Sequence, residues 1–244
     1  MRLDVYLFEN ALATSRTDAK RLVTEGLVSV NGSIVVKPSY DIEETDSVCV
    51  SAAETKFVSR GGLKLKGALE KFRVSVEGKA ALDVGASSGG FTDCLLQNGA
   101  SHVIAVDSGS GQMAGSLRSD PRVTVMENFN ARYMTQADLE YAPEIVVMDV
   151  SFISATCIIP AIYDVAADGA DFICLVKPQF EVGRAGVGKG GIVKDDKLRR
   201  GALQKVIDFA IEHNFELVDS CVSPIKGGDG NIEFLVHFTV RKGV

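Results

Sequence analysis

The chain has 244 residues, of which 46% are hydrophobic and 24% are charged, as in a globular protein of one or two domains. Its net charge of −6 excludes a globally basic molecule, so a nucleic-acid partner has to be met by local basic patches. The sequence has no apolar stretch of the roughly 18 residues that span a bilayer and no signal-peptide pattern, so we expect a cytoplasmic protein without a membrane partner.

Residues 1–58 are the first predicted domain, because they lack the alternation of strands and helices that follows. Apolar residues at helical spacing predict two short helices. The stretch "LVSVNGSIVVKPSYDI" predicts two strands around an Asn31-Gly32 hairpin turn, and "DSVCV" predicts a third strand. This small α+β unit, centred on "SRTDAKRLVTEGLVSVNG", resembles the S4 RNA-binding domain.

The S4 resemblance implies that one helix of this domain faces RNA through Arg16, Lys20 and Arg21. Without the resemblance, these three residues can also be interpreted as the solvated charges of a helix surface. Acidic residues outnumber basic ones in this part of the chain, so RNA binding depends on local geometry.

Basic residues concentrate just after the first domain, in an interdomain joint at residues 59–64 and in the helix predicted after it. These residues are Arg60, Lys64, Lys66, Lys71, Arg73 and Lys79. A basic helix beside a cleft can track phosphates, although the pattern alone favours a solvated helix face. We assign Arg60 and Lys66 as candidate RNA-binding residues.

Residues 59–244 are the second predicted domain, because short apolar runs and helical stretches alternate there. The runs at 80–84, 102–106, 123–125, 145–148 and 171–176 predict a doubly wound α/β sheet. The runs at 215–222 and 232–240 follow each other across a glycine-rich loop, as in an antiparallel pair. We therefore expect a Rossmann-like sheet with an antiparallel last strand.

The first strand–helix turn of this sheet, "LDVGASSGGFTDCL", predicts a nucleotide site. The spacing of its glycines does not match the dinucleotide fingerprint G-x-G-x-x-G. Asp83, within the strand, disfavours a pyrophosphate but suits an ammonium group, and Asp107, at the end of the second strand, is placed for ribose hydroxyls. We therefore favour S-adenosylmethionine over NAD.

Two buried strands end on charged residues. "VVMDVSFIS" places Asp149 at the end of the fourth strand, and "FICLVKPQF" places Lys177 at the end of the fifth. Adjacent parallel strands end at the same edge of the sheet, beside the predicted cofactor site. The two residues are either an ordinary ion pair or part of a catalytic site.

The chain as a whole resembles the haemolysin A-like family, which joins an S4 domain to an FtsJ-like ribosomal RNA 2′-O-methyltransferase. The matching strings are "FVSRGGLKL", "LDVGASSGGFTD", "ENFNAR", "MDVSFIS", "LVKPQFEVGR", "GGIVKD" and "GNIEFL". This resemblance implies methylation of a cytidine ribose in ribosomal RNA, with S-adenosylmethionine as the methyl donor. It also implies the large ribosomal subunit, because the chain is similar in extent to the shorter members.

The resemblance implies a catalytic tetrad of Lys64, Asp149, Lys177 and Glu233. A ribose hydroxyl must lose its proton as it attacks a methyl group, and a lysine serves as base when burial and a neighbouring cation lower its pKa. Asp149 then orients Lys177, and Glu233 orients Lys64 or the ribose. Which lysine is the base stays open, and no metal is needed.

Further positions complete the predicted sites. Glu127 and Asn128 follow the third strand, where related folds hold adenine, and we assign Asn128. The loop "EVGRAGVGKGGIVKD" is either an RNA-closing loop, through Arg184 and Lys189, or a plain surface loop. The complete cofactor set is Asp83, Gly85, Ser87, Gly89, Gly90, Phe91, Asp107, Asn128 and Asp149.

Three alternative functions remain. The first is an RNA-binding protein with an inactive methyltransferase domain, which an intact tetrad disfavours. The second is a haemolysin, which an acidic chain without a spanning or basic amphipathic segment disfavours. The third is a small-molecule O-methyltransferase, which has no use for an S4-like domain.

The five cysteines bear on compartment and metal binding. They are scattered and odd in number, and neither a C-x-x-C pair nor a histidine-rich cluster accompanies them. We expect reduced cysteines in the core.

Overall fold

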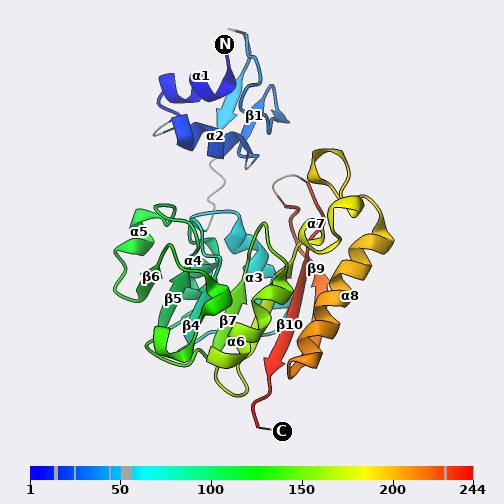
Figure 1. The fold of residues 1–244 in the computed structure, drawn as a ribbon. Coiled ribbons are helices and arrows are strands. Elements are labelled where there is room, and N and C mark those ends of the chain that lie inside the picture. Colours follow the sequence, from blue (N-terminus) through cyan, green and yellow to red (C-terminus); the bar gives the residue numbers. More distant parts are fainter. Residues whose placement is uncertain (14–15, 25, 44, 51–56, 228–229, 244) are drawn as a thin grey trace. The chain divides into compact units, whose positions relative to one another are not determined.

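The computed structural model describes residues 1–244 except 14–15, 25, 44, 51–56, 228–229 and 244, and it leaves the side chains of Asp18 and Arg21 undescribed (Figure 1). The chain divides into two compact units, Met1–Thr55 and Lys56–Val244. Phe57 and Val58, assigned above to the first domain, belong to the second. The Phe57 ring is buried there against Gly62, and the Val58 amide donates to the Asp93 carboxylate at 2.7 Å.

The first unit has two helices and a three-stranded antiparallel sheet. Its elements are α1 (Leu3–Glu9), α2 (Arg16–Thr24), β1 (Val28–Val30), β2 (Ser33–Ile34) and β3 (Val48–Val50), with sheet order β2-β1-β3. Asn31 and Gly32 both have positive φ, as the predicted hairpin turn requires. Leu3, Leu7 and Val23 pack with the inward residues of β1 to form a separate core.

The second unit is built on a seven-stranded sheet of order β6-β5-β4-β7-β8-β10-β9. The strands are β4 (Ala80–Val84), β5 (His102–Val106), β6 (Val123–Met126), β7 (Ile145–Met148), β8 (Asp171–Val176), β9 (Phe215–Val222) and β10 (Phe234–Val240). The strands β4 to β8 are parallel, and β10 runs antiparallel between β8 and β9. The predicted sheet with an antiparallel last strand is therefore confirmed.

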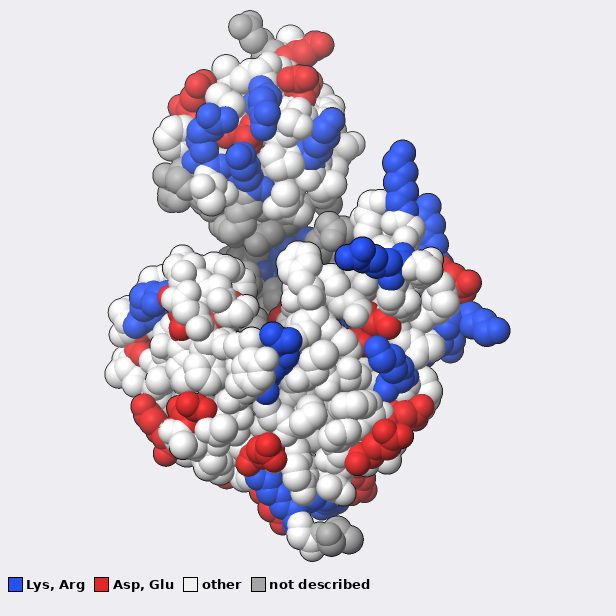
Figure 2. Space-filling model, in the orientation of Figure 1, with Lys and Arg blue, Asp and Glu red and all other residues white. Residues whose placement is uncertain are grey.

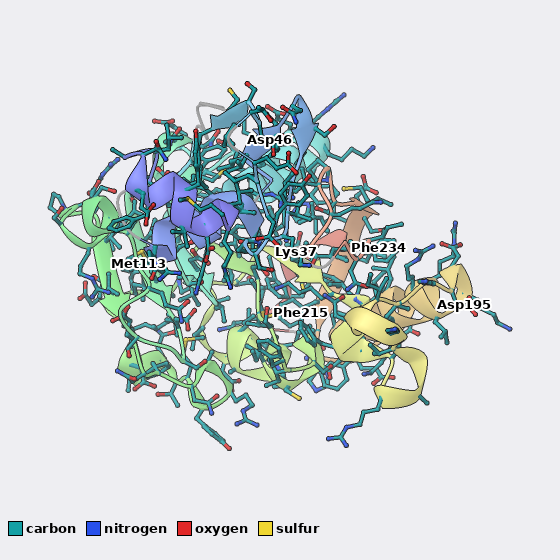
Figure 3. All side chains as sticks on the ribbon, turned by 90° about the horizontal axis from the view of Figure 1, so that it is seen from above. Lys37, Asp46, Met113, Asp195, Phe215 and Phe234 are labelled. Carbon is teal, nitrogen blue, oxygen red and sulfur yellow. The ribbon has the colours of Figure 1, made fainter. Side chains whose placement is uncertain are left out.

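Helices cover both faces of this sheet (Figure 1). They are α3 (Gly61–Phe72), α4 (Gly90–Gln97), α5 (Gly115–Arg118), α6 (Ile159–Val165), α7 (Pro178–Glu181) and α8 (Asp196–Glu212). Short 3₁₀ turns lie at Ala131–Tyr133, Gln136–Asp138, Ala155–Cys157, Arg184–Gly186 and Lys189–Gly191. α8 begins after Asp195, which is labelled in Figure 3. The Asp195 carboxylate accepts the amide hydrogens of Lys197 and Leu198.

Alternation along the strands divides the core into two layers. On β8, Phe172, Cys174 and Val176 pack with α6 and α8, whereas Ile173 and Leu175 pack with α3 and α4. Side chains alternate with a period of two along a strand, so each position fixes which helical layer the residue meets. This alternation decides where the polar residues at the strand ends point.

The prediction of core cysteines is correct for Cys94 and Cys174, which are buried. It is wrong for Cys49 and Cys157, which are exposed because one occupies an outward position of β3 and the other a short 3₁₀ turn. No helix in the described ranges is both long and apolar enough to cross a membrane. The described His, Cys, Asp and Glu side chains form no group of three that suits a metal ion.

Candidate active site

Three of the four tetrad residues follow the alternation of the strands. Phe234 and Val176 face the α6 and α8 layer, so the next residues, Glu233 and Lys177, belong to the layer of α3. Val147 also faces α3, and Asp149 lies two residues further along. The fourth residue, Lys64, is on α3 itself.

Two short ion pairs join these residues. Lys64 Nζ donates to Glu233 Oε2 at 2.6 Å, and Lys177 Nζ lies 2.6 Å from Asp149 Oδ1. The first pair is the more enclosed, with side-chain exposures of 10% and 2%. Burial of two charges is tolerated when each has a well-placed partner. The Lys64–Glu233 pair meets this condition with a hydrogen bond, whereas Lys177 and Asp149 form a close ionic contact in which Asp149 Oδ1 accepts no hydrogen bond from a described donor.

The strand register brings the two pairs to the same edge of the sheet. Phe234 pairs with Val176 across the β8–β10 ladder, so Glu233 stands next to Lys177 at the ends of these strands. Gly227 leaves room for the Glu233 carboxylate, because a Cβ at position 227 would lie 2.4 Å from Oε1. The structure therefore assembles the predicted tetrad as two neighbouring acid–lysine pairs.

A cavity of about 660 Å³ opens beside Asp149, at the point where the strand order reverses between β4 and β7. Its lining comes from the segments after β4, β5, β6 and β7. Four of the predicted cofactor residues line it, namely Gly85, Ser87, Asp107 and Asp149. Gly85 has a φ of +85°, and a Cβ there would lie 2.5 Å from the Asp149 carbonyl oxygen, so the turn requires glycine.

The Asp107 carboxylate is held at the cavity wall by backbone amides. Oδ2 accepts the amide hydrogen of Ser87 at 2.8 Å, and Oδ1 accepts that of Gly109 at 2.7 Å. The Ser87 hydroxyl donates to Gln112 Oε1, and Gln112 also lines the cavity. Each Asp107 oxygen keeps a further lone pair for a ligand hydroxyl.

Asp83 does not line the cavity. It is fully buried behind the wall, where Thr92 Oγ1 donates to its Oδ2 at 2.6 Å and its Oδ1 has no described partner. Burial raises the pKa of Asp83 to about 7, against the lowering effect of the Thr92 hydrogen bond. The predicted contact between Asp83 and a cofactor ammonium group stays a prediction.

Four other predicted cofactor residues also lie outside the lining. Gly89, Gly90 and Phe91 form the start of α4 behind the β4 turn, with the Phe91 ring buried in the core. Asn128 is exposed with a φ of +54°, while the next two residues, Phe129 and Asn130, line the cavity. Glu127 instead binds the Gly111 amide and Arg118, which hold its pKa below the usual value.

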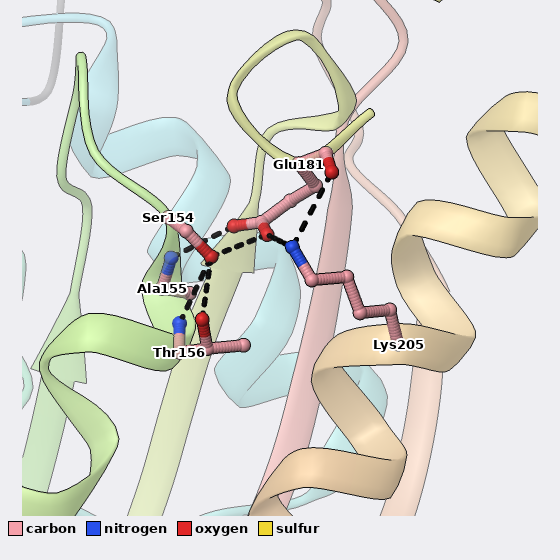
Figure 4. Close-up of polar contacts among 5 residues, drawn as sticks. All are labelled: Ser154, Ala155, Thr156, Glu181 and Lys205. Carbon is pink, nitrogen blue, oxygen red and sulfur yellow. Dashed lines mark hydrogen bonds and ion pairs between the residues drawn. The ribbon is translucent and has the colours of Figure 1, made fainter. Parts of the chain in front are cut away.

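A buried carboxylate missed by the sequence analysis fastens the loop after Asp149 to α7 and α8 (Figure 4). Glu181 accepts hydrogen bonds from Ser154 Oγ at 2.6 Å, the Ala155 amide at 2.7 Å and Lys205 Nζ at 3.1 Å. α7 begins directly after Lys177, and the loop begins directly after Asp149. The cluster therefore supports both strand ends that carry Asp149 and Lys177.

Phe152, also missed, lies on the cavity wall with 92% of its surface exposed. Its φ of +64° is unusual for a residue with a side chain, and its ring lies 5.3 Å from that of Phe180. An apolar ring that projects into solvent at the edge of a cavity offers a stacking surface to a planar ligand.

The predicted RNA-binding residues are distributed over both units. Arg16 is exposed and lies 3.9 Å from the buried Asp4 carboxylate, Lys20 is exposed on the same helix, and the side chain of Arg21 is outside the description. Arg60 is half-buried, with NH2 donating to the Lys226 carbonyl at 3.4 Å. Lys66 pairs with Glu70 and contacts Asn98, so it is less free to track phosphates.

The loop before α8 presents the other basic residues. Arg184 and Lys189 are exposed, and no described acid pairs with either. The buried Asn231 fastens this loop through the Gly191 carbonyl and the Val193 amide. Figure 2 shows lysine and arginine side chains over the loop and α8 on the visible face of the unit.

The sheet order and cavity define the class of protein as an S-adenosylmethionine-dependent methyltransferase fold. The S-adenosylmethionine-dependent methyltransferase from Mesorhizobium loti shares this fold, with a TM-score of 0.53 at 14% identity over 71% of this chain and 96% of its own. The family profile of FtsJ-like methyltransferases matches residues 57–240, and that of the S4 domain matches residues 1–48. The chain therefore belongs to the FtsJ-like methyltransferase family and carries an S4 domain.

Relatives at higher identity agree with this assignment. The 16S/23S rRNA (cytidine-2′-O)-methyltransferase TlyA of Mycobacterium tuberculosis is 44% identical over 96% of this chain and 88% of its own. Hemolysin A of Brachyspira hyodysenteriae is 44% identical over 98% of this chain and 100% of its own. A solved structure of a hemolysin from Streptococcus thermophilus has a TM-score of 0.80 at 43% identity, covering 100% of this chain and 89% of its own.

Proposed function

We propose that the protein methylates the 2′-oxygen of a cytidine ribose in ribosomal RNA, with S-adenosylmethionine as methyl donor. The observation that carries this proposal is the pair of acid–lysine contacts, Lys64–Glu233 and Asp149–Lys177, at the ends of the strands, where Asp149 lines the cavity. The named substrate of the M. tuberculosis relative supports cytidine and ribosomal RNA. Ribosomal RNA as substrate implies a cytoplasmic site of action.

The cavity fits S-adenosylmethionine better than a phosphate-bearing cofactor. Asp107 and Asp149 are the acids on its wall, and carboxylates favour hydroxyl and cationic groups over phosphates. Asp107 would hold ribose hydroxyls, and Phe129 offers an apolar surface near the end of β6. When bound, S-adenosylmethionine supplies an electrophilic methyl group.

Lys177 is the proposed base. Its acid partner Asp149 lines the cavity, whereas the Lys64–Glu233 pair is more enclosed. The ribose 2′-oxygen must lose its proton while it forms its bond to the methyl carbon. A neutral Lys177 amine would accept that proton. Lys64 and Glu233 then fix the edge of the site beside it.

RNA recognition is assigned to the S4 domain and to exposed surfaces of the methyltransferase unit. Arg16, Lys20, Arg184 and Lys189 keep exposed basic side chains for phosphates. Phe152 provides a ring for a nucleobase that has left its stack. A small-molecule methyltransferase would need neither feature.

The test of the function is methyl transfer to purified ribosomal subunits, followed by mapping of 2′-O-methyl groups on 16S and 23S RNA. We expect one or more cytidines to be modified by the wild-type protein and to be unmodified in cells that lack the gene. Absence of transfer to either subunit by a folded, cofactor-binding protein would contradict the proposal and favour a binding protein with an inactive enzyme domain.

Substitution of Lys177 tests the assignment of the base. Lys177→Ala should lower the single-turnover rate by about 10²–10⁴-fold while cofactor affinity stays near wild type. Lys177→Arg keeps the charge and the contact with Asp149 but cannot give up a proton, so it should be nearly as inactive. An arginine variant that retains most of the activity would show that Lys177 only holds a structural ion pair.

A further inference from the structure

Lys177 has a second oxygen partner besides Asp149. Its Nζ donates to Ser151 Oγ at 2.7 Å, and Ser151 lies on the cavity wall two residues after Asp149. The Ser151 side chain is exposed toward the cavity, whereas Lys177 is only 12% exposed. The serine hydroxyl therefore stands at the boundary between the buried amine and the space open to substrate.

The contact with Ser151 affects the direction of the lone pair on the Lys177 nitrogen. A lysine amine has three positions besides its bond to Cε, and a neutral amine fills two of them with hydrogen and one with the lone pair. Ser151 Oγ accepts one hydrogen of this nitrogen at 2.7 Å. Asp149 Oδ1 lies 2.6 Å from Nζ as an ion-pair contact without hydrogen-bond alignment, and its negative charge attracts a second hydrogen. One direction is then left for the lone pair that takes the substrate proton.

We propose that Ser151 is a positioning residue, which together with Asp149 fixes the direction of the Lys177 lone pair. This inference rests on the proposed function, because it assigns Lys177 as the base. With Asp149 alone, the amine can rotate about the Cε–Nζ bond and exchange its second hydrogen with the lone pair. With both oxygens present, rotation breaks a contact, so the lone pair keeps one direction.

The backbone around Ser151 is built to hold the hydroxyl in place. The next residue, Phe152, has a φ of +64°, a left-handed conformation that is unfavourable for a residue with a side chain and persists only where the surroundings hold it. Glu181 fastens Ser154 and Ala155 of the same loop. The direction of Ser151 is therefore set by a turn that is fixed on both sides.

The experiment compares Ser151→Ala and Ser151→Thr with a matched control, Ser101→Ala. Ser101 is an exposed serine just before β5, at the end of that strand away from the cavity. We expect the single-turnover rate of Ser151→Ala to fall by about 10–100-fold, with cofactor affinity within about twofold of wild type. Threonine keeps the hydroxyl and should restore most of the rate, and the control should behave as wild type.

The division between rate and binding separates positioning from a structural role. Loss of a positioning hydroxyl should lower the rate at saturating RNA and cofactor, while the KM for RNA and the melting temperature stay near wild type. Asp149 and the Lys64–Glu233 pair are unchanged in every variant. Loss of rate in both Ser151 variants, or a fall of rate and melting temperature together, would overturn the inference.

Other outcomes distinguish this inference from the proposed function. If Ser151→Ala has the rate of wild type while Lys177→Ala is inactive, the positioning role is wrong and the proposed function stands. If the wild-type protein transfers no methyl group to ribosomal RNA, the proposed function fails and the inference fails with it.

Discussion

At the scale of single residues, the most unusual environment is that of Asp83. Its carboxylate is fully buried, has one hydroxyl donor, Thr92, and has no described cation beside it. A carboxylate in such a site is better accommodated in its protonated form, which is why its pKa rises to about 7 from 3.8. Ionisation of Asp83 near neutral pH therefore destabilises the folded state.

This cost has a definite direction with pH. Because the folded pKa lies above the unfolded one, the contribution of Asp83 to stability is complete below pH 3.8 and is lost as pH rises to about 7. Asp83→Asn removes the ionisation and keeps an acceptor for Thr92. We expect the variant to gain up to about 4 kcal/mol over wild type at pH 8, and much less at pH 5.

Urea unfolding at the two pH values measures the difference, with the exposed Asp164→Asn as a control for the removal of one charge. An equal effect at pH 5 and pH 8 would show that packing, rather than ionisation, decides the stability of this site.

At the scale of elements, the Glu181 cluster joins the loop after β7 to α7 and α8. The Glu181 side chain is 2% exposed, while that of Lys205 is 50% exposed. The two hydrogen bonds to Ser154 and Ala155 are therefore shielded from water, and the ion pair with Lys205 is partly screened. Most of the stabilisation should come from the loop contacts.

Glu181→Gln tests this asymmetry. An amide presents one oxygen and one NH₂ group, so it cannot accept from Ser154 and Ala155 with both ends. We expect a loss of about 1–3 kcal/mol in the free energy of unfolding, together with weaker cofactor binding, because the same loop forms the cavity wall.

The matched variant is Lys205→Met, which removes only the partly screened partner and should cost less than about 1 kcal/mol. Denaturant unfolding and calorimetry with S-adenosylmethionine provide the measurements. A Lys205 variant that is as unstable as the Glu181 variant would show that the ion pair, not the loop contacts, holds the cluster together.

At the scale of the whole molecule, the two units have separate cores, and the two acid–lysine pairs and the cavity belong to the second. Residues 56–244 should therefore fold and bind S-adenosylmethionine without the S4 domain, yet methylate ribosomal RNA poorly. A fragment that starts at residue 60 omits the buried Phe57 and the amide of Val58 that binds Asp93. It should be less stable by about 2–3 kcal/mol.

Melting temperatures and calorimetry on the two fragments, beside the full chain, check this prediction. Equal stability of both would mean that Phe57 contributes nothing to the core. Full methylation activity by residues 56–244 would mean that the S4 domain is not needed to bind the RNA.

The sequence predicted the sheet almost to the residue, because buried strands are continuous apolar runs and end abruptly on polar residues such as Asp149 and Lys177. Lys64 and Glu233 were found only through the family resemblance, since no local pattern marks a residue on a helix as facing a distant strand. Ser151, Phe152 and Glu181 were missed because their importance depends on how loops fold back, which has no periodic signature. For the same reason, the cavity is lined by Phe129 and Asn130 and not by the predicted Asn128.

The position of β10 between β8 and β9 has a consequence for how the protein is made. β9 precedes β10 in the chain but reaches the sheet only through it, and Glu233 meets Lys64 across 169 positions of sequence. During synthesis from the N-terminus, the first unit is complete by Thr55, long before the last strand leaves the ribosome. A nascent chain should therefore be able to hold RNA well before it can modify it, and catalytic competence arrives with the final few residues of the sheet.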